Sequence, residues 1–333
     1  MDPKISARFN DSILQTAMQR YAIAPGRIQL LDGFESIIYE FNRSDGDFIL
    51  RIGHSLRRTC DHILGEVAWI NYLYAGGTTV ARAILSIDGK LVEPIQDGFG
   101  DAFLCTAFVK ARGKIAGKEQ INERLFVNYG RLLGRMHALA KDYTPTSPAM
   151  QRYAWDGPEN NTPDRQLPAT ESSIRRKYQL VFDRLQRLPR DRDGYGMIHQ
   201  DAHTGNLFVD DDYNLTLFDF DDCVYGHFIY DIAMVLFYIA GWGKEDIPGF
   251  IKQFMCSFLQ GYREQNHLDP HWLKEIPLFL KLREIDLFAT ILYTMGETPD
   301  DEWCARFMLG RRARIENDVP FIDFDWDSLT TFL

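Results

Sequence analysis

The chain has 333 residues, of which 45% are hydrophobic and 13% aromatic, enough apolar material for the packed cores of one two-lobed enzyme. Its formal net charge of −10 argues against the broad basic surface that binds nucleic acid or an anionic membrane, so we expect neither partner. The five cysteines form no C-x-x-C pair, the first residues lack the apolar core of a signal peptide, and no apolar run is long enough to span a bilayer. A cytoplasmic protein is therefore expected.

Strand-type patterns dominate the first third of the chain, after an amphipathic segment from Ser6 to Ile23. The runs are "RIQLL", "SIIYEF", "DFILRI", "TVARAILSI", "KLVEPI" and "AFLCTAFV". Asp-Gly turns at Ser44–Asp47 and Ile87–Lys90 predict hairpins, because this dipeptide readily takes the positive φ of tight turns. One helix, from about Arg58 to Tyr74, interrupts the strands. The pattern predicts a small antiparallel sheet with one helix.

A carboxylate lies on or beside the apolar stripe of this helix. Glu66 comes three residues after Ile63 and four before Ile70, and the only basic residue in a nearby strand-type run is Arg51. Burying an unpaired carboxylate costs several kcal/mol, so we expect an ion pair between Arg51 and Glu66. The alternative is that Glu66 flanks the stripe and reaches water.

Beyond residue 109 the patterns become mostly helical, over 124–141, 171–188 and from 228 to the end. We therefore predict an α+β fold with an N-terminal lobe of residues 1–108 and a helical C-terminal lobe of residues 109–333. The proline-rich stretch from Thr144 to Thr170 is predicted to be a long irregular loop, which is usually functional or disordered.

One short window concentrates histidines and carboxylates. It runs through "HQDAHTGNLF", His199 to Phe208, and "LTLFDFDDC", Leu215 to Cys223. Its two strand-type runs, joined by "DDYN", predict a hairpin with Asn206 at its start and Asp219 at its end, so both oxygen donors lie together. Amide and carboxylate oxygens suit Mg²⁺ held jointly with nucleotide phosphates. Asp201, on the preceding loop, is placed to accept or orient a hydroxyl.

The window resembles the catalytic and metal loops of the protein-kinase-like superfamily, H-x-D-x-x-x-x-N followed by D-F-G, which stand here as "HQDAHTGN" and "DFD". The histidine inside the loop, "DFDD", "GHFIYDIAMVL" just after it and "LLGRMHAL" upstream resemble the aminoglycoside phosphotransferase and choline kinase group. That group also includes homoserine kinases of the second type, methylthioribose kinase and a bacterial stress-response protein kinase. The resemblance covers about residues 28 to 240 and implies a two-lobed protein-kinase-like fold.

Carried over residue by residue, the resemblance implies that Asp201 is the catalytic aspartate facing the acceptor hydroxyl. Asn206 and Asp219 would coordinate Mg²⁺, and Asp221 would contact a second metal ion or a water, unless it is a solvated strand-end carboxylate.

Three further residues are expected to support this site. His199 would hold the catalytic loop by hydrogen bonding. His203 would pack within the loop, with substrate contact as the alternative. Asp231 would anchor the loop or, alternatively, cap the helix that it begins.

The same resemblance implies where ATP binds. Arg51 stands where relatives usually have Lys, with Glu66 as its partner, and the base would lie against the segment between the lobes near Thr106, Phe108 and Val109. The loop from 32 to 40 has a single glycine, so its backbone cannot approach the triphosphate as in protein kinases.

The implied reaction is ATP- and Mg²⁺-dependent transfer of a phosphoryl group to a hydroxyl of a small molecule such as an amino-alcohol, a homoserine-like compound or an aminosugar. From Glu284 to Glu302 the chain has acidic side chains and no Lys or Arg. This run favours a cationic acceptor, although such a run is usually a solvated face. The sequence identifies neither the acceptor nor the oligomeric state.

Three rival hypotheses remain open from the sequence. One is a Ser/Thr protein kinase of the bacterial stress-response type, and another is a non-catalytic nucleotide-binding regulator. The third is a metal-dependent hydrolase with a cluster formed by His199, Asp201, His203, Asp219, Asp221 and His227.

Overall fold

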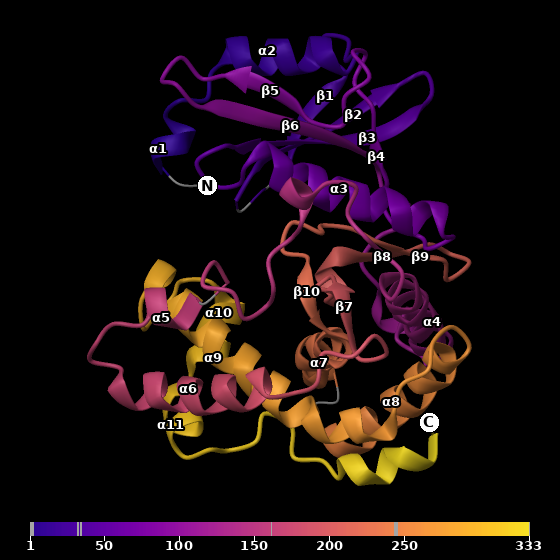
Figure 1. Cartoon of the computed structure of the whole chain (residues 1–333), viewed down its shortest axis with the longest axis vertical. Helices are drawn as coiled ribbons and strands as arrows, with labels where there is room; N and C mark the ends of the chain where they lie inside the picture. Colours follow the sequence, from indigo (N-terminus) through magenta and orange to yellow (C-terminus); the bar gives the residue numbers. More distant parts are fainter. Residues whose placement is uncertain (1–2, 32, 34, 161, 243–245, 333) are drawn as a thin grey trace.

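The computed structural model describes residues 3–31, 33, 35–160, 162–242 and 246–332. The chain forms two lobes, one above the other in Figure 1. The upper, N lobe contains a six-stranded antiparallel sheet, and the lower, C lobe is mostly helical. The last strand of the sheet ends at Val109, and the domain boundary near that residue remains a prediction.

The strands of the N lobe are β1 (Ile28–Leu31), β2 (Ile37–Arg43), β3 (Gly46–His54), β4 (Ala83–Ile84), β5 (Glu93–Gln96) and β6 (Ala102–Val109). The first predicted hairpin is confirmed, with Arg43 opposite Gly46. The second, at Ile87–Lys90, is wrong: β4 and β5 each pair with β6. Because β3 occupies one edge of β6, β4 and β5 lie end to end along its other edge.

Helices cover both faces of this sheet. On one face lie α1 (Pro3–Ser6) and α2 (Asp11–Arg20), whose apolar side chains share a core with the strands. On the other lies α3 (Cys60–Ala75), capped by Thr59 and Gly76, within two residues of the predicted bounds of Arg58 and Tyr74. Val67 and Leu73 of α3 are fully buried in the larger core. The buried face of α3 fixes the direction in which Glu66 points.

The helices of the C lobe are α4 (Glu123–Ala140), α5 (Thr162–Gln166), α6 (Ser172–Gln186), α7 (Phe228–Ile239), α8 (Ile247–Arg263), α9 (Ile276–Met295), α10 (Glu302–Met308) and α11 (Arg311–Glu316). Short 3₁₀ turns are η1 (Lys118–Gln120), η2 (Pro148–Met150), η3 (Thr204–Asn206), η4 (Ala240–Trp242), η5 (Pro270–Glu275) and η6 (Trp326–Phe332). Helices α4 and α8 pack with their backbones in direct contact at Gly130. A Cβ atom at this position would lie 1.9 Å from the carbonyl oxygen of Phe258, so only glycine fits. Among the described residues, no helix is long and apolar enough to cross a membrane.

Two small antiparallel ribbons carry the window singled out in the sequence. One pairs β7 (Tyr195–Ile198) with β10 (Val224–His227), and the other pairs β8 (Leu207–Val209) with β9 (Leu215–Leu217). The predicted hairpin between 206 and 219 is therefore confirmed. Figure 1 shows both ribbons at the top of the C lobe, facing α3 and the sheet.

The stretch from Thr144 to Thr170 is more ordered than the sequence predicts, since η2 and α5 lie within it. Arg152, which is 5% exposed, attaches it to the rest of the protein. Its guanidinium donates to the carbonyl oxygens of Cys223 at 2.9 Å and His62 at 3.1 Å. This stretch therefore joins α3 to the segment that carries Asp219 and Asp221.

Candidate active site

The loop after β7 is held by one buried carboxylate. Asp231, fully buried in α7, accepts hydrogen bonds from the backbone amides of His199 at 2.9 Å and Gln200 at 2.7 Å, and lies 3.2 Å from His137 Nε2. The N-cap of α7 is His227, so Asp231 does not cap this helix. Gln200 has a φ of 69°, a left-handed conformation that such bonds stabilise. The geometry fits the anchoring role that the resemblance implies.

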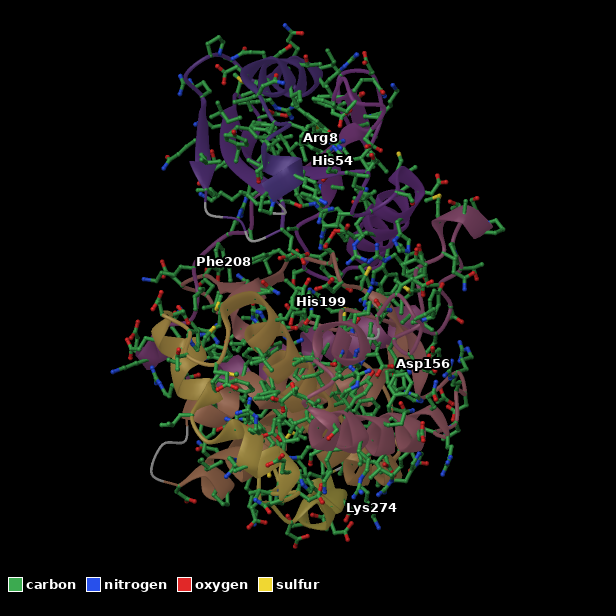
Figure 2. All side chains as sticks on the ribbon, turned by 90° about the vertical axis from the view of Figure 1, so that its left-hand side faces the viewer. Arg8, His54, Asp156, His199, Phe208 and Lys274 are labelled. Carbon is green, nitrogen blue, oxygen red and sulfur yellow. The ribbon has the colours of Figure 1, made fainter. Side chains whose placement is uncertain are left out.

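His199 connects this loop to the end of β9. Its Nε2 lies 3.1 Å from the carbonyl oxygen of Phe218, and its Nδ1 accepts from the backbone amide of Asp201 at 3.3 Å. Figure 2 shows His199 and Phe208 at the junction of the two lobes. The ring is fully buried, which fits a supporting position better than contact with a substrate.

Three polar side chains surround the carboxylate of Asp201. Oδ2 lies 3.3 Å from Asn206 Nδ2 and 3.3 Å from His203 Nε2, and Oδ1 lies 3.1 Å from Nη2 of Arg283. Burial alone would raise the pKa of Asp201, but the hydrogen bond with His203 and the charge of Arg283 hold that pKa well below its usual range. Asp201 is therefore ionised at neutral pH and suited to orient a hydroxyl.

Asn206 and Asp219 lie at the same end of the β8–β9 hairpin. The amide of Phe218 donates to the carbonyl oxygen of Asn206 at 3.0 Å, and Asp219 follows directly with a φ of 62°. Because Nδ2 of Asn206 faces Asp201, its amide oxygen points the other way. An amide oxygen and an exposed carboxylate fit Mg²⁺, which would neutralise phosphate charge there. Their role as metal ligands remains a prediction.

Asp221 is enclosed by arginines. Arg57 contacts its Oδ2, Arg58 Nη2 lies 3.6 Å from the same oxygen, and Arg51 Nη1 lies 3.8 Å from Oδ1. Burial would raise the pKa of Asp221, but these three guanidinium groups lower it well below its usual range. Arg58 also pairs with Asp222 at 2.8 Å. A metal ion at Asp221 would have to exchange with these cations, and that role also stays a prediction.

A cavity of about 480 Å³ separates the sheet from the β8–β9 hairpin. Its polar lining residues are Glu40, Arg51, Glu66, Lys110 and Asp219, and its apolar ones include Ile38, Ile49, Phe108, Phe208 and Phe218. Arg51 and Glu66 form two parallel bonds of 2.8 and 2.7 Å, so the predicted ion pair is confirmed. The size and mixed lining suit a nucleotide, with the base on the apolar side.

The segment between the lobes contributes unevenly to this cavity. Phe108 and Val109 line it, whereas Thr106 does not, and the Thr106 hydroxyl is buried with no hydrogen-bond partner among the described residues. The backbone amide of Val109 donates to the carbonyl oxygen of Arg82 at 2.9 Å, and that of Lys110 donates to the carbonyl oxygen of Asp47 at 3.0 Å. Neither amide is free for a base.

The phosphate-covering loop expected at 32–40 is described only in part. Asp32 and Phe34 lie outside the described residues. Glu35 contacts Arg57, which also contacts Asp221. The loop is therefore connected to the segment that carries Asp219 and Asp221 through one arginine.

Sequence reasoning missed two residues of α7 and α9 that lie beside the Asp201 loop. Arg283 lies on α9, and its Nη2 donates to the hydroxyl of Tyr238, on α7, at 2.5 Å. The ring of His203 lies against Tyr238, with ring centres 4.5 Å apart, and its Nδ1 accepts from the amide of Gly205 at 2.8 Å. No motif marks Arg283 or Tyr238, whereas the Arg57–Arg58 pair before α3 could have been noticed as a charge cluster.

The metal cluster of the hydrolase hypothesis is not assembled. His227 is fully buried among aromatic rings, 5.0 Å from Tyr195 and 5.4 Å from Trp272 between ring centres. Within the described part of the chain, the one acidic or histidine trio with metal-like spacing is Glu35, Asp221 and Asp222, and Arg57 and Arg58 pair with these carboxylates.

Three of the six acidic residues between Glu284 and Glu302 pair with basic residues that lie outside this run. Glu284 pairs with Lys281 at 2.5 Å and Arg311 at 2.7 Å, and Glu297 pairs with Arg312 at 2.7 Å. Asp301 caps α10, and Glu302 pairs with Arg306 within that helix. Asp286 makes no salt bridge with the described residues, and burial raises its pKa to about 7.

Comparison with known proteins identifies the class. Residues 27–275 match the model of the phosphotransferase enzyme family, APH. The chain is 35% identical to amicoumacin kinase of Bacillus subtilis (strain 168) over 327 residues, which cover 96% of each protein. The chain therefore belongs to the phosphotransferase enzyme family.

Solved structures agree with this assignment. An amicoumacin kinase, hAmiN, in complex with AMP-PNP, Ca²⁺ and Ami, superposes with a TM-score of 0.94 at 33% identity, covering 99% of this chain and 100% of that one. A microcompartment-associated aminopropanol kinase shares the fold, with a TM-score of 0.71 at 22% identity over 92% of this chain and 95% of that one. The protein is an ATP- and divalent-metal-dependent kinase that phosphorylates a hydroxyl of a small molecule, and neither the protein-kinase nor the hydrolase hypothesis is favoured.

Proposed function

We propose that the acceptor is amicoumacin or a close structural analogue. The observation that carries this proposal is the extent of the likeness to amicoumacin kinases, which covers 96 to 99% of the chain. The general family match ends at residue 275, but α9, which begins at Ile276, supplies Arg283 to Asp201. The part of the chain beyond the family match therefore includes the acceptor side of the site.

We also propose that the acceptor carries an ammonium group and that Asp286 binds it. Asp286 follows Arg283 by nearly one turn of α9, and Tyr178 and Tyr230 lie close enough for its charge to raise their pKa values. A nearby cation would favour the ionised form of this half-buried carboxylate. This gives the cationic acceptor one specific partner among the acidic residues from Glu284 to Glu302, since Asp286 makes no salt bridge with the described residues.

In the proposed reaction, Asp201 aligns the acceptor hydroxyl for in-line attack on the γ-phosphorus. Its low pKa makes it a weak base, so proton transfer contributes little and positioning contributes most. Arg51 and Lys110, which line the nucleotide cavity, would bind and orient the nucleotide. Five free cysteines and the need for ATP lead us to propose a cytoplasmic location.

The direct test is to incubate the purified protein with ATP, Mg²⁺ and amicoumacin, and to measure ADP formation and product mass. We expect acceptor-dependent ADP and a product heavier by one phosphoryl group, both absent in Asp201→Ala. A parallel panel of amino-alcohols, aminosugars and their neutral hydroxyl analogues tests the ammonium preference. If another acceptor is phosphorylated and amicoumacin is not, the proposed acceptor is wrong.

A further inference from the structure

Arg283 reaches the catalytic carboxylate from a helix far along the chain. Its Nη2 lies 3.1 Å from Oδ1 of Asp201 and 2.5 Å from the hydroxyl of Tyr238. Its Nε is buried and has no hydrogen-bond partner among the described residues, although 23% of the side chain is exposed. The guanidinium is therefore fixed at one nitrogen and has further donor capacity available.

The two oxygens of Asp201 have different surroundings. Oδ2 faces Asn206 Nδ2 and His203 Nε2, each at 3.3 Å, on the side of the expected metal site. Oδ1 meets Arg283 alone among the described residues. A carboxylate oxygen has two lone pairs, so Oδ1 can still accept a hydrogen bond from an acceptor hydroxyl. With ordinary hydrogen-bond lengths, that hydroxyl oxygen would lie roughly 5 Å from Nη2 of Arg283.

That distance leaves space for one phosphoryl oxygen between the hydroxyl and the guanidinium. Charge in the transition state spreads over the three equatorial phosphoryl oxygens, and a fixed guanidinium at that position stabilises it. Arg51 does not serve this purpose, because Glu66 holds its guanidinium through two bonds of 2.8 and 2.7 Å. Arg57 and Arg58 are paired with Asp221 and Asp222.

We propose that Arg283 is a catalytic residue that binds the phosphoryl group during transfer, from the acceptor side. This inference rests on the proposed phosphoryl transfer. In that step the acceptor O–H bond breaks and an O–P bond forms, while the bond from the γ-phosphorus to ADP breaks and its electron pair stays on ADP. The proton leaves through Oδ1 of Asp201 to water. Arg283 forms no covalent bond and keeps its proton throughout.

The test compares Arg283→Met and Arg283→Lys with wild type, and uses Arg131→Met as the matched control. Arg131, on α4, is an exposed arginine paired with the exposed Glu264, which directly follows α8. We expect Arg283→Met to lower kcat by about 10²- to 10³-fold, and Arg283→Lys by less. The Kd for Mg²⁺-ATP should stay within about twofold of wild type in both variants, because Arg283 contacts the phosphoryl group only during its transfer. Arg131→Met should leave kcat and Kd unchanged.

A second measurement does not depend on activity. ADP with Mg²⁺ and aluminium fluoride mimics the phosphoryl group in flight, and its affinity is compared with that of ADP and Mg²⁺ alone. Wild type should gain affinity when aluminium fluoride joins ADP and Mg²⁺, and Arg283→Met should reduce this gain by at least about tenfold. The affinity for ADP and Mg²⁺ alone should stay unchanged. Tyr238→Phe removes the hydroxyl that holds Nη2 and should lower kcat by about three- to tenfold.

The outcomes separate this inference from the proposed function. A kcat for Arg283→Met within threefold of wild type overturns the inference, as does a loss confined to the acceptor KM or to nucleotide affinity. Should Arg283→Met fail to fold, Arg283→Lys and Tyr238→Phe decide the same question. A wild-type protein that phosphorylates no acceptor contradicts the proposed function instead, and the aluminium fluoride comparison or the acceptor-free hydrolysis of ATP then tests Arg283.

Discussion

The nucleotide side and the acceptor side of the active site are built in different ways. On the nucleotide side, Arg51, Glu66, Asn206 and Asp219 stand at fixed spacings on one strand, one helix and one hairpin. On the acceptor side, Arg283 reaches Asp201 from α9, across 82 positions of sequence. Local sequence pattern therefore predicts the first side, whereas the second depends on tertiary packing.

The largest effect is expected where both sides meet. Asp201→Ala and Asp219→Ala should each lower turnover by at least about 10³-fold, since one loses the group that orients the hydroxyl and the other a predicted metal ligand. Steady-state ADP formation and Mg²⁺-dependent ATP binding distinguish them: binding should survive in Asp201→Ala and fall in Asp219→Ala. Asp211→Ala, in the exposed β8–β9 turn, is the control. Wild-type turnover in either variant would mean that the catalytic assignment is wrong.

The next largest effect tests the nucleotide side alone. Arg51→Met leaves Glu66 buried without its partner and should cost about 3 to 5 kcal/mol of stability, together with loss of ATP binding. The double variant Arg51→Met/Glu66→Leu should recover stability but not ATP binding. Denaturant unfolding and nucleotide titration measure the two quantities.

A surface pair provides the control for this experiment. Arg192→Met removes the exposed pair with Asp142 and should change the free energy of unfolding far less than Arg51→Met does. Equal costs for the buried and the exposed pair would show that Arg51 and Glu66 do not form the buried pair seen here.

A smaller effect is expected at the carboxylate that anchors the catalytic loop. Asp231→Asn places an amide where two backbone N–H groups and His137 need acceptors, and should cost about 2 to 3 kcal/mol. kcat should fall by about tenfold or more, because the loop carrying Asp201 loosens. Asp269→Asn, at the exposed cap of η5, should be nearly neutral. A stable Asp231→Asn protein with normal kcat would contradict the anchoring role.

The smallest effect concerns pH on the acceptor side. Folding raises the pKa of Asp286 from an ordinary value of 3.8 to about 7, so the folded protein keeps a proton that the unfolded chain loses. The free energy of unfolding of wild type should therefore decrease as pH rises from about 4 to 7. That of Asp286→Asn should not show this decrease. Thermal unfolding at pH 5, 6, 7 and 8 measures the difference, with Asp211→Asn as control. A Tm difference that does not change with pH would contradict a raised pKa.

These two sides also differ in what the sequence predicted. The pairing of Arg51 with Glu66 followed from a carboxylate beside an apolar stripe and one nearby cation. The placement of Asn206 beside Asp219 followed from the register of a short hairpin. Arg283, Tyr238 and the arginines around Asp221 were not predicted, because their contacts depend on how separate elements pack.

The sheet shows the same limit on a smaller scale. The strand-type runs and α3 were recognised from their patterns, but the pairing of β4 and β5 was not. A tight turn between two runs predicts that they pair, and here both strands instead complete one free edge of β6. Local turn geometry does not determine which partner a strand finds.

The arginines before α3 have a consequence for how substrates enter. Arg57 and Arg58, from the N lobe, form ion pairs with Asp221 and Asp222 of the C lobe. Arg51 also lies close to Asp221. Dissolved salt weakens these ion pairs and also screens the electrostatic attraction between the same arginines and an incoming triphosphate. The two influences act oppositely on the rate of nucleotide uptake, which should therefore peak at an intermediate ionic strength.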